Sequence, residues 1–219
     1  EIPSRPSPAE QTAIDSPPEA EKKVLLEGPG EITYLEIAYR APRACEKDFF
    51  ILTVLDSILT GPTSLNMFGS GISNKTSRLY QALVEKDLAV SVNGGLMATI
   101  DPYLFEITAT VHPNKKAQDV LNAIDKEIDR LLNQTINIDE IRRAVKQAKA
   151  LFVYGSENIT NQAFWMGYSN MFATYDWFES YLEHLEMVTQ TELQHAAETY
   201  LNPQHRVVGI YQPRQMHVN

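Results

Sequence analysis

The alternation of apolar and polar residues predicts strands at both ends of the chain. Val24 to Leu26 and Ile32 to Arg40 are separated by Gly28-Pro29-Gly30, and the second run places Leu35, Ile37 and Tyr39 on one face. This period of two is typical of half-buried strands joined by a turn. Val207 to Tyr211 supplies a final strand, which must return to the sheet begun near residue 24 because alone it has nothing to pair with.

A second pair of strands is predicted in the middle of the chain. The run from Leu88 to Ala98 contains Gly94-Gly95, which suggests a bulge or bend, and Asp101-Pro102 then turns the chain. Leu104 to Val111 alternates again. An antiparallel pair is the simplest interpretation.

Helices are predicted between and after these strands. Glu46 to Thr60 is apolar on all sides, so we place it deep in the fold, and Gly61-Pro62 ends it. Apolar stripes within 117–131 and 141–152 predict two amphipathic helices. A last helix, from about Thr191 to Leu201, precedes the final strand.

Two helix starts have the spacing of a capping box, Asn137 with Glu140 and Thr189 with Glu192. Between them, 159–187 predicts one or two helices whose aromatic side chains we assign mostly to the core: Phe164, Trp165, Tyr168, Phe172, Trp177, Phe178 and Tyr181. The order of elements indicates an α+β domain. We assign it to residues 21–213, after a Pro-rich linker at 1–20 and before a tail at 214–219.

Composition and charge exclude several classes of partner. With 43% hydrophobic and 21% charged residues among 219, the chain suits a soluble globular protein, and its net charge of -9 opposes nucleic-acid binding. Cys45 is the only cysteine, which we interpret as a buried or idle thiol that allows neither an internal disulfide nor a thiolate zinc site. No apolar run approaches the roughly 18 residues that span a bilayer. The start at Glu1 suggests a processed product or a piece of a longer protein.

Two stretches approach known motifs without completing them. Gly69 to Thr76 nearly matches a phosphate-binding loop, but Asn74 replaces the glycine before the Lys and no buried strand precedes it, so a flexible loop is the better interpretation. His195 and Glu198 match the inverted zinc motif His-x-x-Glu-His, but Thr199 stands at the second His. A solvated helix face explains this stretch better.

Other polar clusters also indicate solvated surfaces. His184 and Glu186 are two positions apart on a helix, so they point to different sides and cannot chelate one ion. A charged helix face is predicted at Asp125, Lys126, Glu127, Asp129 and Arg130. No Gly-x-Ser-x-Gly elbow is present. By residue chemistry alone, the chain shows no catalytic group.

Thr76 to Val92 is the most distinctive stretch of the chain. It combines a hydroxyl pair that can cap a helix, a short helix with Leu79, Leu83 and Val84 on one side, and an alternating run. Ser77-Arg78-Leu79-Tyr80, followed by Glu85-Lys86-Asp87-Leu88-Ala89-Val90-Ser91-Val92, resembles the second, non-zinc half of pitrilysin/insulinase-type metallopeptidases. The resemblance covers about residues 21–213 and includes the closing strand before Gln212-Pro213.

The resemblance implies a two-layer α+β half, with a mostly antiparallel sheet of about five to six strands and helices packed on one face. Two such halves would enclose a chamber that holds a peptide as an added strand. In the zinc-bearing half the motif His-x-x-Glu-His lies in the first long helix. The matching positions here are Thr53, Asp56 and Ser57, so neither imidazole is present and this chain should bind no zinc.

The resemblance also implies substrate-binding positions. The non-zinc half of active members carries an Arg and a Tyr that grip and polarise the substrate; Val84 and Val90 match them here, with one residue deleted near Asp87. Losing such an electrophilic donor costs roughly 100- to 1,000-fold in rate. We expect a peptide to contact Val84, Val90, Ser91 and Asn93.

The resemblance therefore implies the non-catalytic half of a zinc-dependent peptidase, which closes the peptide-binding chamber. The zinc would belong to an N-terminal domain or a homologous partner subunit, and this chain would hold no cofactor. The alternative is a proteolytically inactive assembly subunit of the same family, and a nucleotide-binding module using Gly69 to Thr76 is the third hypothesis. We expect a peptide substrate, no nucleic acid, no membrane span, and a bacterial cytoplasmic or periplasmic location.

Overall fold

The computed structural model describes residues 18–62 and 75–214 of the chain. Five strands form one mixed sheet in the order β1-β5-β2-β4-β3. The edge strand β1 (Lys22–Gly28) runs parallel to β5 (Arg206–Pro213), and every other neighbouring pair is antiparallel, with β2 (Tyr34–Ala41), β4 (Tyr103–Val111) and β3 (Ala89–Leu96) completing the sheet. This confirms the predicted α+β class and the mostly antiparallel sheet.

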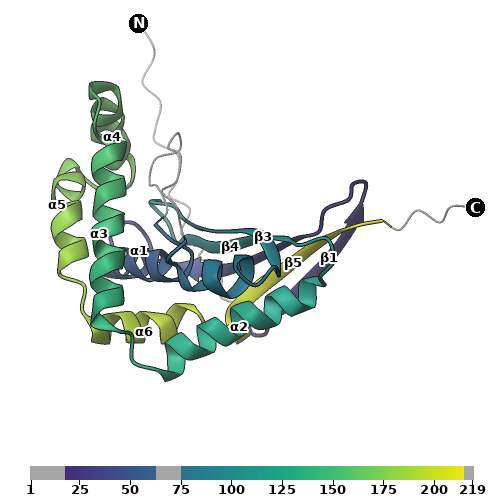
Figure 1. Cartoon of the computed structure of the whole chain (residues 1–219). Helices are drawn as coiled ribbons and strands as arrows, with labels where there is room; N and C mark the ends of the chain where they lie inside the picture. Colours follow the sequence, from purple (N-terminus) through teal and green to yellow (C-terminus); the bar gives the residue numbers. More distant parts are fainter. Residues whose placement is uncertain (1–17, 63–74, 215–219) are drawn as a thin grey trace, which may run out of the picture.

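The helices fall into two groups (Figure 1). One group lies along the sheet and consists of α1 (Lys47–Leu59), α2 (Ala117–Asn133) and α6 (Gln190–Tyr200). The other stands at one end of the sheet and consists of α3 (Ile138–Gly155), α4 (Ile159–Phe172) and α5 (Tyr175–Glu186). Two short helical turns, η1 (Tyr80–Val84) and η2 (Pro203–His205), precede β3 and β5.

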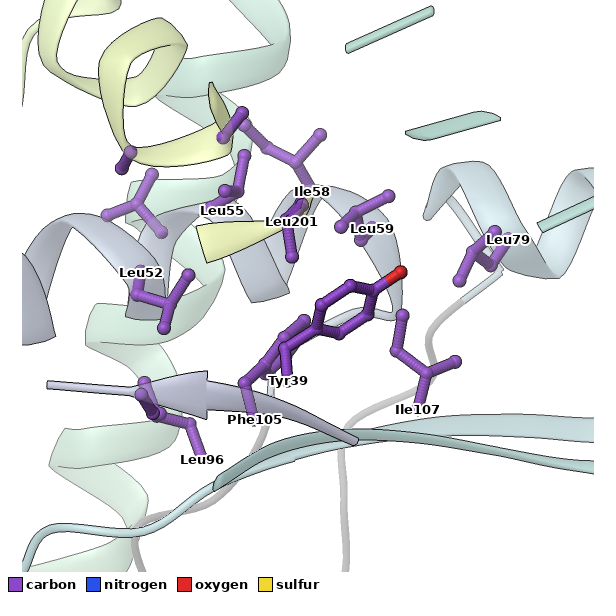
Figure 2. Close-up of a cluster of buried hydrophobic side chains, with 14 of the residues drawn as sticks. Tyr39, Leu52, Leu55, Ile58, Leu59, Leu79, Leu96, Phe105, Ile107 and Leu201 are labelled. Atoms are coloured by element: carbon purple, nitrogen blue, oxygen red, sulfur yellow. The ribbon is translucent and has the colours of Figure 1, made fainter. Parts of the chain in front are cut away.

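The core lies between the sheet and α1. Leu35, Ile37 and Tyr39 of β2 are at most 1% exposed, which confirms the face predicted from their spacing. Figure 2 shows the Tyr39 ring beside Phe105 of β4 and beneath the leucines of α1. Burial of these large side chains supplies the main driving force for packing helix on sheet.

The predicted return of the last strand to the start of the sheet is confirmed. β5 pairs with β1 through Val24 opposite Gly209, and with β2 through Ile37 opposite Val208. It therefore lies between the two strands that follow each other in the sequence. Within the described ranges, β1 has β5 as its one neighbour in the sheet.

Arg206, the first residue of β5, anchors this arrangement. Its side chain is 3% exposed and donates hydrogen bonds to Glu21 at 2.7 and 2.9 Å, to Asp125 of α2 at 2.5 and 3.1 Å, and to the Tyr39 hydroxyl at 3.1 Å. Burial raises the pKa of Tyr39 to about 12. One guanidinium thus joins β5 to β2, α2 and the residue before β1.

The solvated face predicted on α2 is exposed at Lys126, Asp129 and Arg130 but not at its other two residues. The face predicted to be solvated contains Glu127, which is 6% exposed and accepts hydrogen bonds from Arg130, and Asp125, which binds buried Arg206. Glu127 pairs within α2 and Asp125 pairs with β5, and a charge count along the sequence does not reveal either contact. Cys45 is exposed, so of the two predicted alternatives, a buried or an idle thiol, the buried one is wrong.

Of the two predicted capping boxes, one forms completely and the other forms only in part. Thr189 and Glu192 form the complete box, in which the Glu192 carboxylate also accepts from the Thr189 hydroxyl. Asn137 caps α3 by accepting from the Asp139 N–H at 2.8 Å. Glu140 instead accepts two hydrogen bonds from Arg78, because an ion pair with a guanidinium is available to it.

The aromatic residues of 159–187 belong to the core, as predicted. The most buried are Trp165, Phe172, Trp177 and Tyr181, at 7% exposure or less. Their rings pack on one another and on Phe50 of α1, and the Trp177 indole donates to the Ala44 carbonyl at 2.7 Å. This cluster joins α4 and α5 to α1.

Candidate functional site

The positions predicted to match a zinc motif, Thr53, Asp56 and Ser57, lie on α1, where each makes a hydrogen bond within the protein. The Thr53 hydroxyl donates to the Phe49 carbonyl at 2.8 Å, and the Ser57 hydroxyl donates to the Ala144 carbonyl of α3 at 3.1 Å. Asp56 is 1% exposed and accepts a hydrogen bond from the Thr60 hydroxyl at 2.5 Å. Ser57 thus joins α1 to α3, whereas Thr53 and Asp56 bond within the helix and its C-cap, and with Thr60 these residues form the α1 cluster.

Gly94 of β3 forms the other side of this cluster. A Cβ atom at Gly94 would overlap both the Asp56 carboxylate and the Thr60 hydroxyl. Gly94 and Gly95 continue the regular pairing with Ile107 and Glu106, so of the predicted bulge or bend, the bulge is wrong. The register shift lies between Ala89 and Ser91 instead, and Gly94 serves the close approach of helix and strand.

Tyr181 of α5 closes the cluster next to Thr53. Burial raises the pKa of Tyr181 well above its usual value, the hydrogen bond with Thr53 lowers it, and the charge of Asp56 raises it further. The phenol is therefore neutral and serves as a packing and hydrogen-bonding group at ordinary pH.

Zinc does not fit this site. The predicted motif positions supply two hydroxyls, from Thr53 and Ser57, and one carboxylate, from Asp56, whereas zinc sites in proteins use imidazole, thiolate and carboxylate ligands. In residues 18–62 and 75–214, no group of three or more His, Cys, Asp or Glu side chains could hold a metal ion. His184 stacks against Phe50 and Glu186 pairs with Lys149, so the two side chains have separate roles.

The distinctive stretch folds as a short, wide helical turn that leads into β3. Tyr80 to Val84 forms a π-helix, with the Glu85 N–H donating to the Tyr80 carbonyl at 3.1 Å. The Ser77 hydroxyl accepts from the Tyr80 N–H at 3.4 Å, so one of the two predicted capping hydroxyls acts at the helix start. Leu79 and Leu83 are fully buried.

An ion pair and a left-handed residue fix the ends of this stretch. Arg78 donates two 2.8 Å hydrogen bonds to Glu140 of α3, and both side chains are 16% exposed. Asp87 has a φ of 52°, a conformation that Asp tolerates better than most residues. The chain reverses there, and the His112 N–H then donates to the Leu88 carbonyl at 3.0 Å.

The proposed substrate positions occupy two environments. Val84 packs partly buried against the core, whereas Val90 is 57% exposed at the register shift of β3. Ser91 and Asn93 lie on the face of β3 away from α1, and the Ser91 hydroxyl donates to Thr110 of β4 at 3.0 Å. The structure thus brings Val90, Ser91 and Asn93 together on an edge strand, and it places Val84 in the preceding helical turn, against the core.

The near-matching phosphate loop falls mostly outside the described residues, which include only Lys75 and Thr76 of it. Thr76 accepts a hydrogen bond from Gln147 at 3.2 Å.

Sequence reasoning missed two members of the α1 cluster, Thr60 and Gly94. The signal for Gly94 was its place inside a strand, where glycine marks either a bulge or a close contact.

Comparisons with known proteins agree with this geometry. Residues 1–148 match the model of the peptidase M16 inactive domain, so the chain belongs to that family. Among curated proteins, none matches the chain.

Solved structures show the same fold. A protease from Helicobacter pylori has 18% identity and a TM-score of 0.79, over 93% of this chain and 48% of the protease. The inactive peptidase domain of a candidate zinc protease from Bordetella parapertussis has 20% identity and a TM-score of 0.72, over 88% of this chain and 99% of that one. A chain of complex III2 from Candida albicans has 14% identity and a TM-score of 0.69, over 88% of this chain and 45% of that one. This chain therefore spans about half the length of the Helicobacter protease.

Proposed function

We propose that this chain is the non-catalytic half of a zinc-dependent peptidase, which closes a peptide-binding chamber and supports the substrate. The observation that carries the proposal is the α1 cluster: Thr53, Asp56 and Ser57, which we align with the zinc motif, include no imidazole, and Ser57 bonds α1 to α3 while Asp56 packs against Gly94 of β3. Such a half would form one wall of the chamber and bind the peptide, and zinc would belong to a second half.

The edge of the sheet supports a role in peptide binding. β3 has β4 as its one sheet neighbour among the described residues, and a peptide can join a sheet only at such an edge. Val90 and Asn93 are exposed along this strand. They would contact side chains of an added peptide while the strand backbone supplies hydrogen bonds.

Reconstitution tests this function. The chain is mixed with the proposed zinc-bearing half, taken from the same source organism. Hydrolysis of a peptide library is then measured with and without a zinc chelator. We expect cleavage only when both halves and zinc are present. Cleavage by the zinc-bearing half alone at the same rate would refute the supporting role.

A pair of variants locates the peptide. Val90→Lys places a charge at the proposed edge, and Val153→Lys on α3, where Val153 is 52% exposed, makes the same change elsewhere. Val90→Lys should lower kcat/KM roughly tenfold, corresponding to about 1.4 kcal/mol of lost binding. Val153→Lys should leave it unchanged, and equal effects of both would rule out the β3 edge.

A second function, an inactive assembly subunit, is favoured by the apolar side chains of Val84 and Val90. Neither can polarise a carbonyl group. The fold also occurs in a chain of complex III2 from Candida albicans. If the chain forms a stable complex with the zinc-bearing half while that complex cleaves no peptide of the library, this result would favour the assembly subunit over the peptidase half.

A further inference from the structure

The opposite edge strand, β1, exposes apolar side chains on both of its faces. Six of its seven residues are exposed, and Val24, Leu25 and Leu26 are 46%, 59% and 59% exposed. In the described part of the chain, β1 has one sheet neighbour, β5. An apolar edge strand of this kind is a template for pairing with another strand.

The register of the sheet assigns each β1 side chain to a face. Leu26 lies beside Tyr211, which lies beside Tyr34, and Tyr34 points away from the core that holds Leu35. Val24 and Leu26 therefore lie on the face of the sheet away from α1. Lys23, Leu25 and Glu27 alternate onto the other face.

The sequence Lys22-Lys23-Val24-Leu25-Leu26-Glu27-Gly28 is complementary to itself when two copies run antiparallel about Leu25. Lys23 of each copy then lies opposite Glu27 of the other, and Val24 lies opposite Leu26. Leu25 meets its own counterpart on the two-fold axis. Opposite charges and apolar pairs directly across two strands both stabilise a sheet.

Neighbouring registers lack this match. A shift that centres the pairing on Val24 places Lys23 opposite Leu25, and a shift that centres it on Leu26 places Leu25 opposite Glu27. Registers shifted by a single residue would pair side chains from opposite faces. One register therefore satisfies charge and apolar pairing on both faces.

We propose that β1 is an interface between two copies of this chain, which pair antiparallel in this register and join their five-stranded sheets into one. Contacts within each copy hold the charged side chains of the edge in place. Lys23 lies 3.1 Å from Glu21, and Glu27 accepts a hydrogen bond from Gln212 at 2.8 Å. The interface is isologous, because each copy supplies the same strand.

Charge reversal tests the register. The molar mass of the full chain is measured by sedimentation equilibrium over a range of concentrations for the natural sequence, Lys23→Glu, Glu27→Lys and the double variant. Each single reversal creates two repulsive pairs, so the dimer should dissociate roughly 10- to 30-fold more readily. The double reversal restores both pairs and should recover the dimer.

Two further variants complete the experiment. Lys126→Glu, at an exposed position of α2, makes the same change in net charge and should leave dimerisation unchanged. Leu25→Lys places two like charges on the two-fold axis and should give a monomer. A natural chain that stays monomeric at all concentrations, or a dimer that responds equally to Lys23→Glu and Lys126→Glu, would overturn the proposal.

Discussion

Gly94 of β3 and Asp56 of α1 approach so closely that a Cβ atom on the glycine would overlap the carboxylate of the aspartate. The buried carboxylate thus packs against bare backbone, with the Thr60 hydroxyl as its hydrogen-bond donor. The position that resembles the Glu of a zinc motif serves here to join a helix to a strand.

Gly94→Ala should therefore destabilise the protein. The added methyl must displace Asp56 and Thr60, which lie 1% and 2% exposed in the core, and overpacking of this kind costs about 1–3 kcal/mol. Urea unfolding followed by circular dichroism measures the loss.

Gly95→Ala is the matched control for this change. Its Cβ would meet only Glu106 Oε2, at an ordinary 3.8 Å, so we expect no loss of stability. Equal destabilisation by the two substitutions would show that the strand requires glycine for its backbone rather than for the contact with α1.

Arg206→Leu should cost about 3 kcal/mol in the free energy of unfolding, because it leaves Glu21, Asp125 and the Tyr39 hydroxyl without their shared donor. We place the cost at the lower end for a buried ion pair, since the carboxylate side chains of Glu21 and Asp125 remain 25% and 32% exposed. Denaturant unfolding provides the measurement.

Arg142→Leu serves as the reference for this prediction. Arg142 and Asp139 form an ion pair with side chains 74% and 78% exposed, and such pairs contribute between about 0 and 1 kcal/mol. Similar costs for the two substitutions would contradict the anchoring role of Arg206.

Glu192 makes stability depend on pH in the acid range. Hydrogen bonds from the Lys47 ammonium and from Thr189 lower the pKa of Glu192 from 4.5 to about 2. The folded state thus binds this proton more weakly than the unfolded chain, so the stabilisation is present above about pH 4.5 and is lost as the pH falls toward 2.

Glu192→Gln should reduce the free energy of unfolding at neutral pH, and its difference from the natural chain should shrink between pH 4.5 and 2. Urea titrations at several pH values measure this difference. Glu198→Gln, at an exposed position of the same helix, is the control. A difference that stays constant down to pH 2 would exclude the linkage.

The sequence predicted the strands best where one face is buried. Leu35, Ile37 and Tyr39 alternate because β2 has helices on one side only, and this regularity is visible without a structure. The place of β5 between β1 and β2 is set by tertiary packing and by the Arg206 contacts, neither of which leaves a periodic signal.

The candidate site was only partly accessible to the same reasoning. The absence of imidazoles at Thr53 and Ser57 is a property of the sequence, but the burial of Asp56 against Gly94 depends on how α1 crosses β3. Charged residues misled the prediction for Asp125 and Glu127, because ion pairing allows acids to lie beside the core.

The position of β5 affects the order in which the sheet can assemble during synthesis. β2, β4 and β3 are neighbours completed by residue 111, whereas β1 waits for residues 206–213 before it gains its partner. Throughout that interval Lys22–Gly28, which precedes the other four described strands, lacks the strand it pairs with in the folded sheet. The longest-range strand pair therefore completes the sheet, and it depends on the last strand in the chain.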